Sequence, residues 1–366
     1  MLVCRTEVTI MNPAFRLVAV LLIMLFPEHL LAAESPLVIA HRGASGYLPE
    51  HTLEAKVLAF AQGADFLEQD VVMTRDDQLV VFHDLTLERT TNVEIMYPER
   101  ARSDGSWYVV DFTLAELRGL RVGEGERDIE GEITAIYPDR FPPGTSHFTI
   151  HTLQEELEVI HGLKASTGLE AGIYPELKSP WFHHQHGKDI STAVLQVLKE
   201  YGYTSTEDAV YLQSFDYNEL VRVKNELLPA VGMDLKLVQL IADNSWGETR
   251  ERNDNGIWTD YDYNWMHSQV GLGQLSNTVQ GVGPSWDMLL VASPPGEIPA
   301  PNDFVSMAHD AGLEVHPFTF RRDQLPQWAD DFGQLLNHFF NTLAVDGIFT
   351  DFPDLAKAFL ESPQLP

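Results

Sequence analysis

The stretch FLEQDVVMTRDDQLVVFHD, residues 66–84, decides how the strands of this chain are arranged. It contains two apolar segments, Phe66–Thr74 and Leu79–His83, which are separated only by the residues RDDQ. Two parallel strands need a crossover of at least about a dozen residues, so these two segments must form an antiparallel hairpin. The run from Phe66 to His83 is therefore one strand with a hairpin return.

The register of this hairpin predicts which polar side chains meet. A pairing that sets Val72 opposite Val81 also sets Asp70 opposite His83, and opposed residues share one face of a sheet. Alternation along the strand places Glu68 on that face as well. We therefore expect Glu68, Asp70 and His83 to gather on one side of the hairpin, a grouping that a shift of one residue would undo.

Apolar strand candidates alternate with amphipathic helix candidates along the rest of the chain, and this alternation is typical of a parallel sheet with helical crossovers. The hairpin return accounts for one strand candidate, and eight parallel strands remain. We expect them to close into a TIM (β/α)8 barrel. The strand candidates are Leu37–His41, Phe66–Thr74, Leu79–His83, Ala171–Leu177, Ala209–Phe215, Leu235–Ile241, Gln280–Pro284, Leu313–Phe318 and Gly347–Thr350.

Two long segments, residues 85–148 and 243–277, do not fit the repeat and are predicted to be loop insertions in a single catalytic domain, residues 34–366. Both fall in connections on the side of the barrel where active sites lie. Loops of this length are usually lids or shape a substrate site, and the alternative is a surface excursion that only packs.

The composition is that of a globular protein with a strongly acidic balance. There are 54 acidic and 24 basic residues among 366, which gives a formal net charge of -30. Nucleic acid is excluded as a partner because its binders need a basic surface. A solvated acidic surface is the simplest interpretation, and an anionic substrate would then need a local group of cations.

The N-terminus predicts export. RLVAVLLIMLF, residues 16–26, has a cationic start and an apolar core of about 10 residues, which suits a signal peptide better than a membrane span of about 20. We expect a signal peptide over residues 1–33, with Met11 as an alternative start. Its removal takes away Cys4, the only cysteine, and leaves a periplasmic or secreted chain with no stable membrane insertion.

Five motifs in order carry a resemblance to a known family. They are HRGASGYLPEHT (residues 41–52), LEQDVVMTRDDQLVVFHD (67–84), YPELK (174–178), LQSFD (212–216) and GIFTDFPD (347–354). Together they resemble the glycerophosphodiester phosphodiesterases, specifically the periplasmic type, from about residue 37 to the C-terminus. The resemblance implies hydrolysis of small diesters such as glycerophosphocholine and glycerophosphoethanolamine to sn-glycerol 3-phosphate and an alcohol.

The residues in these motifs suit that chemistry. Hydrolysis of a phosphodiester anion requires charge neutralisation, a base for the nucleophile and an acid for the leaving oxygen. A cluster of carboxylates suits a hard divalent cation, Ca²⁺ first and Mg²⁺ second, acting as a Lewis acid and a template. The expected metal ligands are Glu68, Asp70 and Glu176.

Imidazoles and cations supply the remaining roles. Histidine titrates near neutral pH, and we favour His41 as the base and His83 as the acid. Arg42 offers a planar fork for phosphate oxygens, and Lys178 shares the orientation of Glu176 two residues earlier. The residues expected to line the glycerol pocket are Gln213, Phe215 and Phe318.

Plainer interpretations stay open at this point. Asp70 could only orient His83, Glu176 and Lys178 could form an interior salt bridge, and the aromatic residues could belong to the core. Three clustered histidines, His183, His184 and His186, do not have a common zinc spacing, and loop packing or substrate contact is favoured for them. Asp351 and Asp354 are interpreted as caps or turn formers.

Two rival functions also remain. One is a lyase-type phosphodiesterase acting on phosphoinositol or sphingomyelin-like lipids, for which a released cyclic phosphate would be the signature. The other is a surface binding protein on the same scaffold, because a fold alone does not determine function. The complete set of histidines, carboxylates and cations, which a binding protein does not need, favours the hydrolase.

Overall fold

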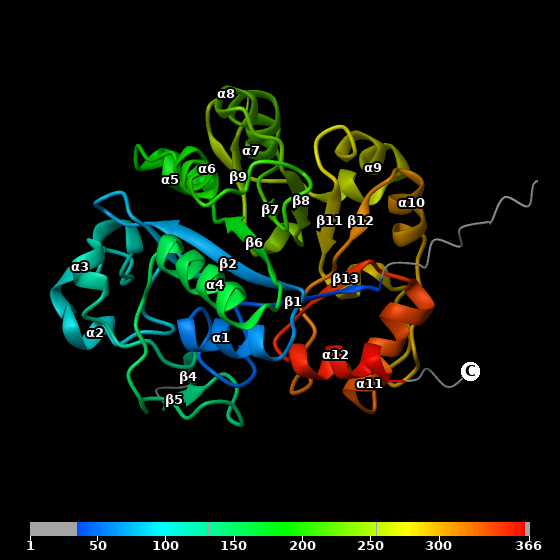
Figure 1. The fold of residues 1–366 in the computed structure, drawn as a ribbon, viewed down its shortest axis with the longest axis horizontal. Helices are drawn as coiled ribbons and strands as arrows, with labels where there is room; N and C mark the ends of the chain where they lie inside the picture. Colours follow the sequence, from blue (N-terminus) through cyan, green and yellow to red (C-terminus); the bar gives the residue numbers. More distant parts are fainter. Residues whose placement is uncertain (1–34, 130–131, 254, 363–366) are drawn as a thin grey trace, which may run out of the picture. The chain divides into compact units, whose positions relative to one another are not determined.

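The computed structural model describes residues 35–129, 132–253 and 255–362, in which eight parallel strands form a barrel (Figure 1). The parallel neighbours run in the order β12-β11-β8-β7-β6-β2-β1-β13. Between β12 and β13 the barrel is closed by the bridge from Phe320 to Thr350 and by the Phe349 amide, which donates to the Pro317 carbonyl at 3.0 Å. The predicted TIM barrel is confirmed. The strands are β1 (Leu37–Ala40), β2 (Phe66–Met73), β6 (Gly172–Leu177), β7 (Tyr211–Ser214), β8 (Lys236–Ile241), β11 (Gly281–Pro284), β12 (Glu314–Val315) and β13 (Gly347–Thr350).

Helices cover the outer surface of the strands; in Figure 1, α1 and α4 lie beside β2, and α12 lies near β1. The ends of α4 have standard signals, since Thr152 and Glu155 form a capping box and Gly168 ends the helix with a φ of 72°. The helices are α1 (Leu53–Ala61), α4 (Leu153–Thr167), α5 (Pro180–Gln185), α6 (Ile190–Glu200), α7 (Tyr217–Arg222), α8 (Leu228–Val231), α9 (Gln269–Leu275), α10 (Phe304–Asp310), α11 (Phe332–Asn337) and α12 (Pro353–Glu361).

The antiparallel return of β2 is β3 (Leu79–Val81), as predicted, but the expected register is wrong by one residue. Val72 pairs with Val80 and not with Val81. The Thr74 amide donates to the Gln78 carbonyl at 2.9 Å, so only the residues between them form the loop. Asp77 has a φ of 59°, which gives a hairpin loop with a left-handed last residue.

The register shift places Phe82 opposite Asp70, and the Phe82 amide donates to the Asp70 carbonyl at 2.8 Å. His83 still reaches the active-site cavity, because β3 ends at Val81 and the chain bends away from the ladder before the histidine. His83 therefore reaches the cavity because the strand ends before it, and not because its side chain shares a sheet face with Asp70.

The two long insertions have their own small elements. Residues 85–148 contain α2 (Val93–Met96), α3 (Leu114–Leu117), the antiparallel β4 (Glu126–Ile129) and β5 (Glu132–Ala135), and a separate apolar core beyond the end of β2. Residues 243–277 contain the turn η4 (Asn244–Trp246), the antiparallel pair β9 (Arg250–Arg252) and β10 (Trp258–Asp260), and α9. The other short helical turns are η1 (Pro98–Arg100), η2 (Val109–Asp111), η3 (Val223–Leu227), η5 (Asn264–His267), η6 (Trp286–Leu289) and η7 (His338–Leu343).

The predicted signal peptide, residues 1–33, lies outside the described residues and stays a prediction. Among the residues that the structure does describe, no helix has both the length and the apolar character needed to span a bilayer.

Aromatic rings pack against one another inside the barrel. Tyr174 stacks on Tyr211 at 5.0 Å between ring centroids, and Phe349 meets Tyr174 edge to face. His316 is fully buried beside these rings, and its Nδ1 lies 2.9 Å from the Tyr174 hydroxyl. Burial lowers the pKa of His316 to about 4.

The buried His316 predicts an acid-sensitive contribution to stability. Its folded-state pKa lies below the unfolded value, so the unfolded state binds more protons between pH 6.5 and 4 and stability falls as the pH decreases. Lowering the pH from 7 to 5 should cost wild type about 2 kcal/mol more than a His316→Gln variant. Urea unfolding of both proteins at the two pH values measures this difference, and equal losses would contradict the prediction.

Candidate active site

One cavity of about 300 Å³, at the carboxyl ends of the barrel strands, brings all the predicted site residues together. Its walls also include residues that the sequence did not single out, among them Trp246, Glu248 and Arg321. The residues predicted from the sequence that line it are His41, Arg42, Glu68, Asp70, His83, Glu176, Lys178, Gln213, Phe215 and Phe318.

His41 follows β1 and is held by Asp351, the residue that follows the neighbouring strand β13. The His41 Nδ1 lies 2.6 Å from Asp351 Oδ1, which leaves Nε2 at 4.0 Å from Glu68. Burial and the nearby Arg42 lower the pKa of His41 to about 4, although Asp351 opposes the shift. The imidazole is therefore neutral near pH 7, with one fixed nitrogen and one available nitrogen.

Asp351, which the sequence predicts as a cap or turn former, instead holds the cavity residue His41, a contact that was not predicted from the sequence. Its second oxygen accepts hydrogen bonds from Arg140 at 2.7 Å and Arg321 at 2.8 Å. Burial alone would raise the pKa of Asp351, but Arg321 and His41 hold it well below its usual range. A signal was available, because β1 and β13 pair in parallel with Ala40 opposite Thr350, so the next residues meet.

His83 is oriented in the same way by its neighbour Asp84. The His83 Nδ1 is hydrogen-bonded to Asp84, and Asp84 is also paired with Arg89 from the first insertion. The free Nε2 lies 3.4 Å from the Lys178 Nζ. Burial, with Arg42 and Lys178 nearby, lowers the pKa of His83 to about 3.

Glu68, Asp70 and Glu176 form a buried carboxylate cluster in which one oxygen of each lies within 4.8 Å of the others. The cluster follows from pairing, because β2 and β6 are parallel neighbours with Asp70 opposite Glu176, and Glu68 shares the face of Asp70. Burial raises the pKa of Glu68 to about 8 and that of Glu176 well above its usual range. The neighbouring carboxylates also repel one another, and a cation between them would offset this repulsion.

Asp70 is held ionised by a partner that the sequence did not predict. Its Oδ2 lies 2.7 Å from the Nε2 of buried His51, so Asp70 does not orient His83. Burial alone would raise the pKa of Asp70, but His51 and His83 hold it well below its usual range. Asp70 Oδ1 is buried without a hydrogen-bond partner, as is the neighbouring Gln213 Oε1. An unpartnered oxygen within the carboxylate cluster and a second one on Gln213 fit the donor set of a hard cation.

Two cations flank the carboxylates. Lys178 Nζ lies 3.1 Å from Glu176, so the interior salt bridge considered from the sequence is present, but it lines the cavity. Arg42 is paired with Glu50 at 2.9 Å, and its backbone amide donates to Glu68 at 2.8 Å. Arg42 has a φ of 59°, a left-handed conformation that is uncommon for a residue with a side chain and typical of functional sites.

The remaining predicted residues form one wall of the cavity. The Gln213 side-chain amide donates to Glu68 at 3.0 Å, which fixes one oxygen of that carboxylate. Phe215 and Phe318 meet edge to face with ring centroids 5.8 Å apart. The wall therefore combines an apolar surface with a positioning contact to the carboxylate cluster.

The clustered histidines on α5 do not converge on a common site. His183 Nε2 accepts a hydrogen bond from the Met73 amide at 3.1 Å, whereas His186 Nδ1 lies 2.9 Å from the Phe182 carbonyl. These contacts agree with packing, one of the two roles favoured for these histidines, although the segment forms helix α5 and not the expected loop.

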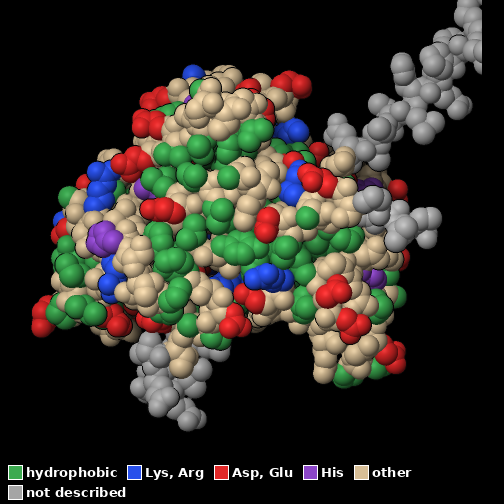
Figure 2. All heavy atoms as spheres, turned by 60° about the horizontal axis from the view of Figure 1, so that its bottom comes forward, with side chains coloured by type: hydrophobic (Ala, Val, Ile, Leu, Met, Phe, Trp, Pro, Cys, Tyr) green, Lys and Arg blue, Asp and Glu red, His purple; other side chains and the backbone are tan. Residues whose placement is uncertain are grey.

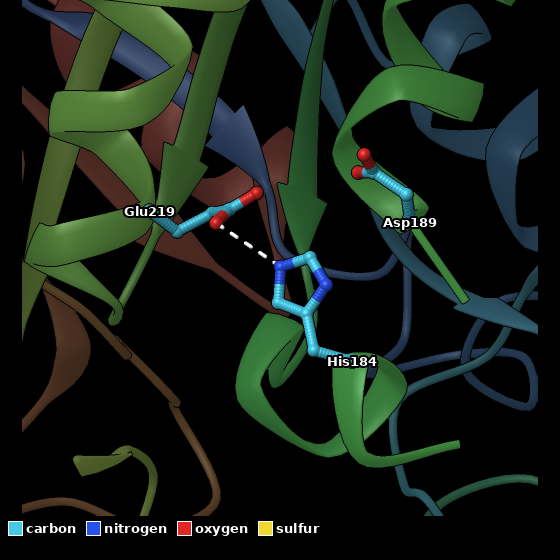
Figure 3. A group of neighbouring side chains, drawn as sticks. All are labelled: His184, Asp189 and Glu219. Carbon is cyan, nitrogen blue, oxygen red and sulfur yellow. Dashed lines mark hydrogen bonds and ion pairs between the residues drawn. The ribbon is translucent and has the colours of Figure 1, made fainter. Parts of the chain in front are cut away.

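His184 points the other way, toward Asp189 and Glu219 (Figure 3). It lies 3.3 Å from Glu219, but Arg222 pairs with both carboxylates, at 2.6 Å from Asp189 and 2.7 Å from Glu219. A guanidinium already neutralises this group, so it is an ion-pair network between helices and not a second metal centre.

The acidic residues of the chain do not form a single patch on the face drawn in Figure 2, where Asp and Glu side chains lie at many separate positions. The buried cations Arg42 and Lys178 therefore provide the local positive charge that an anionic substrate requires, inside the cavity.

Comparison with known proteins agrees with this site. The family model for glycerophosphoryl diester phosphodiesterases matches residues 41–355. A glycerophosphodiester phosphodiesterase of Haemophilus influenzae is 50% identical over 328 residues, 89% of this chain and 90% of the relative. One of Treponema pallidum is 44% identical over 333 residues, 90% of this chain and 93% of the relative.

Solved structures with the same fold include two phosphodiesterases. A glycerophosphoryl diester phosphodiesterase structure from Silicibacter pomeroyi has a TM-score of 0.61 and 26% identity, and covers 89% of this chain and 93% of its own. An Oleispira antarctica phosphodiesterase in complex with sn-glycerol-3-phosphate has a TM-score of 0.58 and 24% identity, and covers 90% of this chain and 98% of its own. The chain belongs to the glycerophosphoryl diester phosphodiesterase family.

Proposed function

We propose that this enzyme hydrolyses glycerophosphodiesters, such as glycerophosphocholine and glycerophosphoethanolamine, to sn-glycerol 3-phosphate and an alcohol. The names of relatives at 50% and 44% identity support this activity, as does the product bound in the Oleispira antarctica structure. The observation that carries the proposal is the cavity itself, in which two histidines, each oriented by an aspartate, flank buried carboxylates and two cations.

In the proposed reaction, His41 acts as the base and His83 as the acid. The low pKa of His41 keeps its Nε2 free to accept a proton from the nucleophile, and Asp351 stabilises the charged ring that results. Burial, together with Arg42 and Lys178, lowers the pKa of His83, and the negative charge of a bound diester would oppose the effect of the two cations and so favour a proton on His83 for the leaving oxygen. The nucleophile is water or the glycerol 2-hydroxyl, and the second route passes through a cyclic phosphate.

The enzyme is proposed to need a divalent cation, Ca²⁺ first and Mg²⁺ second. Glu68, Asp70 and Glu176 would hold it, and the unpartnered Asp70 Oδ1 and the proximity of the three carboxylates support this assignment. When bound, the ion supplies Lewis-acid stabilisation of the phosphate charge. Arg42 and Lys178 are proposed to have a different role from the ion: their positive charges attract the anionic substrate to an otherwise acidic protein.

The enzyme is further proposed to act in the periplasm or after secretion, because residues 16–26 have the charge and length of a signal peptide core. N-terminal sequencing of the exported protein tests this location, and an intact residue 1–33 segment would contradict it.

The activity is tested by incubating purified residues 34–366 with glycerophosphocholine and Ca²⁺. We expect choline and sn-glycerol 3-phosphate in equal amounts, measured by coupled enzyme assays. Phosphocholine with glycerol as products, or no turnover, would contradict the proposal. A cyclic phosphate as the final released product would identify the lyase-type alternative.

A further inference from the structure

A short turn at the start of the second insertion lies at the edge of the active-site cavity. Its residues Trp246 and Glu248 line that cavity, and they also line a second cavity beside it. The second cavity shares His83 and Lys178 with the first and is bounded on the far side by Trp181. It therefore continues the active site on the His83 side, where the proposed acid meets the leaving alcohol.

Local hydrogen bonds hold the turn in place. The Trp181 indole N–H donates to the Glu248 carbonyl at 3.1 Å, which ties the insertion to α5. The Asn244 side-chain oxygen accepts a hydrogen bond from the Tyr263 amide at 2.8 Å. The Asp243 side chain accepts one from the Ser245 amide at 2.8 Å and caps η4. Trp246 and Glu248 are therefore presented by an ordered backbone and do not need to assemble on binding.

Trp246 is exposed, and its indole ring could contact a cation from a bound substrate. Trp246 is 47% exposed as a residue, and the tilted contact of its ring with Phe318 has centroids 6.4 Å apart. Within the described residues, Arg250 lies over Trp181 and Arg252 over Trp258, whereas no arginine or lysine lies over Trp246.

The Glu248 carboxylate is similarly available. Its shortest ion pair in the described part of the chain is 3.9 Å, to Lys178, which is longer than a charge-assisted hydrogen bond. Its side chain is 29% exposed. An open aromatic face and an under-coordinated carboxylate thus stand together at the exit of the catalytic cavity.

We propose that Trp246 and Glu248 form a subsite for the positively charged alkylammonium group of the leaving alcohol. The inference rests on the proposed function, since it assigns one half of that substrate. With the phosphate beside Arg42 and Lys178, the two carbons of an ethanolamine or choline group place the nitrogen next to this turn. A cation over an indole face is stabilised by the ring quadrupole, and the carboxylate adds an opposite charge.

The test compares glycerophosphocholine with glycerophosphoglycerol, whose head group is uncharged. For Trp246→Leu we expect kcat/KM for the choline diester to fall about 3- to 30-fold relative to that for the glycerol diester. Glu248→Gln should change the ratio in the same direction. Inhibition by added choline chloride should weaken by a similar factor in Trp246→Leu, whereas inhibition by sn-glycerol 3-phosphate should not.

Trp265→Leu is the matched control, because Trp265 belongs to the same insertion but packs on Tyr217 and lines neither cavity. It should leave the ratio of the two substrates unchanged. An equal fall for both diesters, or an unchanged ratio in both Trp246→Leu and Glu248→Gln, would overturn the subsite. Absence of hydrolysis of either diester by the wild type would instead overturn the proposed function.

Discussion

Replacing His41 with asparagine is expected to lower kcat/KM for glycerophosphocholine by about 10²- to 10⁴-fold, the range typical of a lost general base. Asparagine retains a hydrogen-bonding group near Asp351 but cannot take a proton at the position of Nε2. His41 is buried, and its Nδ1 contact of 2.6 Å fixes the ring. The measurement is steady-state hydrolysis with Ca²⁺ present, together with circular dichroism to show that the variant is folded.

A surface histidine provides the control for this change. His161 lies on the outer helix α4, beside the rings of Tyr201 and Tyr203. His161→Asn should keep wild-type kcat/KM. If His41→Asn kept full turnover, the assignment of the base would be wrong.

Asp351→Asn separates positioning from proton transfer. It preserves the size of the side chain but removes the charge that stabilises a protonated His41, so activity should fall by less than in His41→Asn. The pH at which activity is half-maximal should also move, because Asp351 opposes the lowering of the His41 pKa. Removing it leaves the His41 pKa lower, so the acid limb should shift to lower pH.

The barrel itself was predictable because its strands are short apolar runs separated by segments long enough to cross over. For the hairpin at residues 74–78, the register was predicted wrongly by one residue. The sequence RDDQ allows two loop lengths, and the choice of the shorter loop depends on Asp77 adopting a left-handed backbone. A shift of one residue was expected to separate His83 from Glu68 and Asp70. It does not, since His83 lies beyond the paired residues.

The candidate site was predictable where chemistry and strand ends coincide, as for His41 and Glu176. It was not predictable where a partner comes from a distant segment. His51 reaches Asp70 across the first loop, and Arg140 reaches Asp351 from the first insertion. No spacing in the sequence indicates these contacts, because they depend on how each loop folds back over the barrel.

Both insertions make contacts at the cavity in addition to their own packing. The first supplies Arg89 and Arg140, which pair with the aspartates that orient His83 and His41. The second supplies Trp246 and Glu248 at the exit of the cavity. Under the proposed function, these long loops on a rigid scaffold would provide positioning contacts and substrate contacts, while the strand ends would provide the reacting groups.

Removing the divalent ion should have an effect as large as that of removing His41. With Glu68, Asp70 and Glu176 buried together, the proposed ion would supply several kcal/mol of charge stabilisation, so chelation should lower kcat/KM by at least about 100-fold. Adding back Ca²⁺ should restore the rate, and Mg²⁺ should restore part of it. Full activity after exhaustive chelation would contradict the metal assignment.

Asp70→Asn tests the same ion without relying on turnover. Asp70 offers a buried oxygen without a partner, so the amide variant should bind Ca²⁺ more weakly in calorimetry and lose the thermal stabilisation that the ion gives wild type. Asp189→Asn, in the ion-pair network with His184 and Glu219, is the matched control and should bind Ca²⁺ like wild type. If Ca²⁺ binding were lost in Asp189→Asn but kept in Asp70→Asn, the metal site would have to be assigned to the group of His184, Asp189 and Glu219 instead. Weakening in Asp70→Asn alone is expected from the geometry, because the barrel cluster, unlike the Asp189 and Glu219 group, has no guanidinium within the described residues at hydrogen-bonding distance from its carboxylate oxygens.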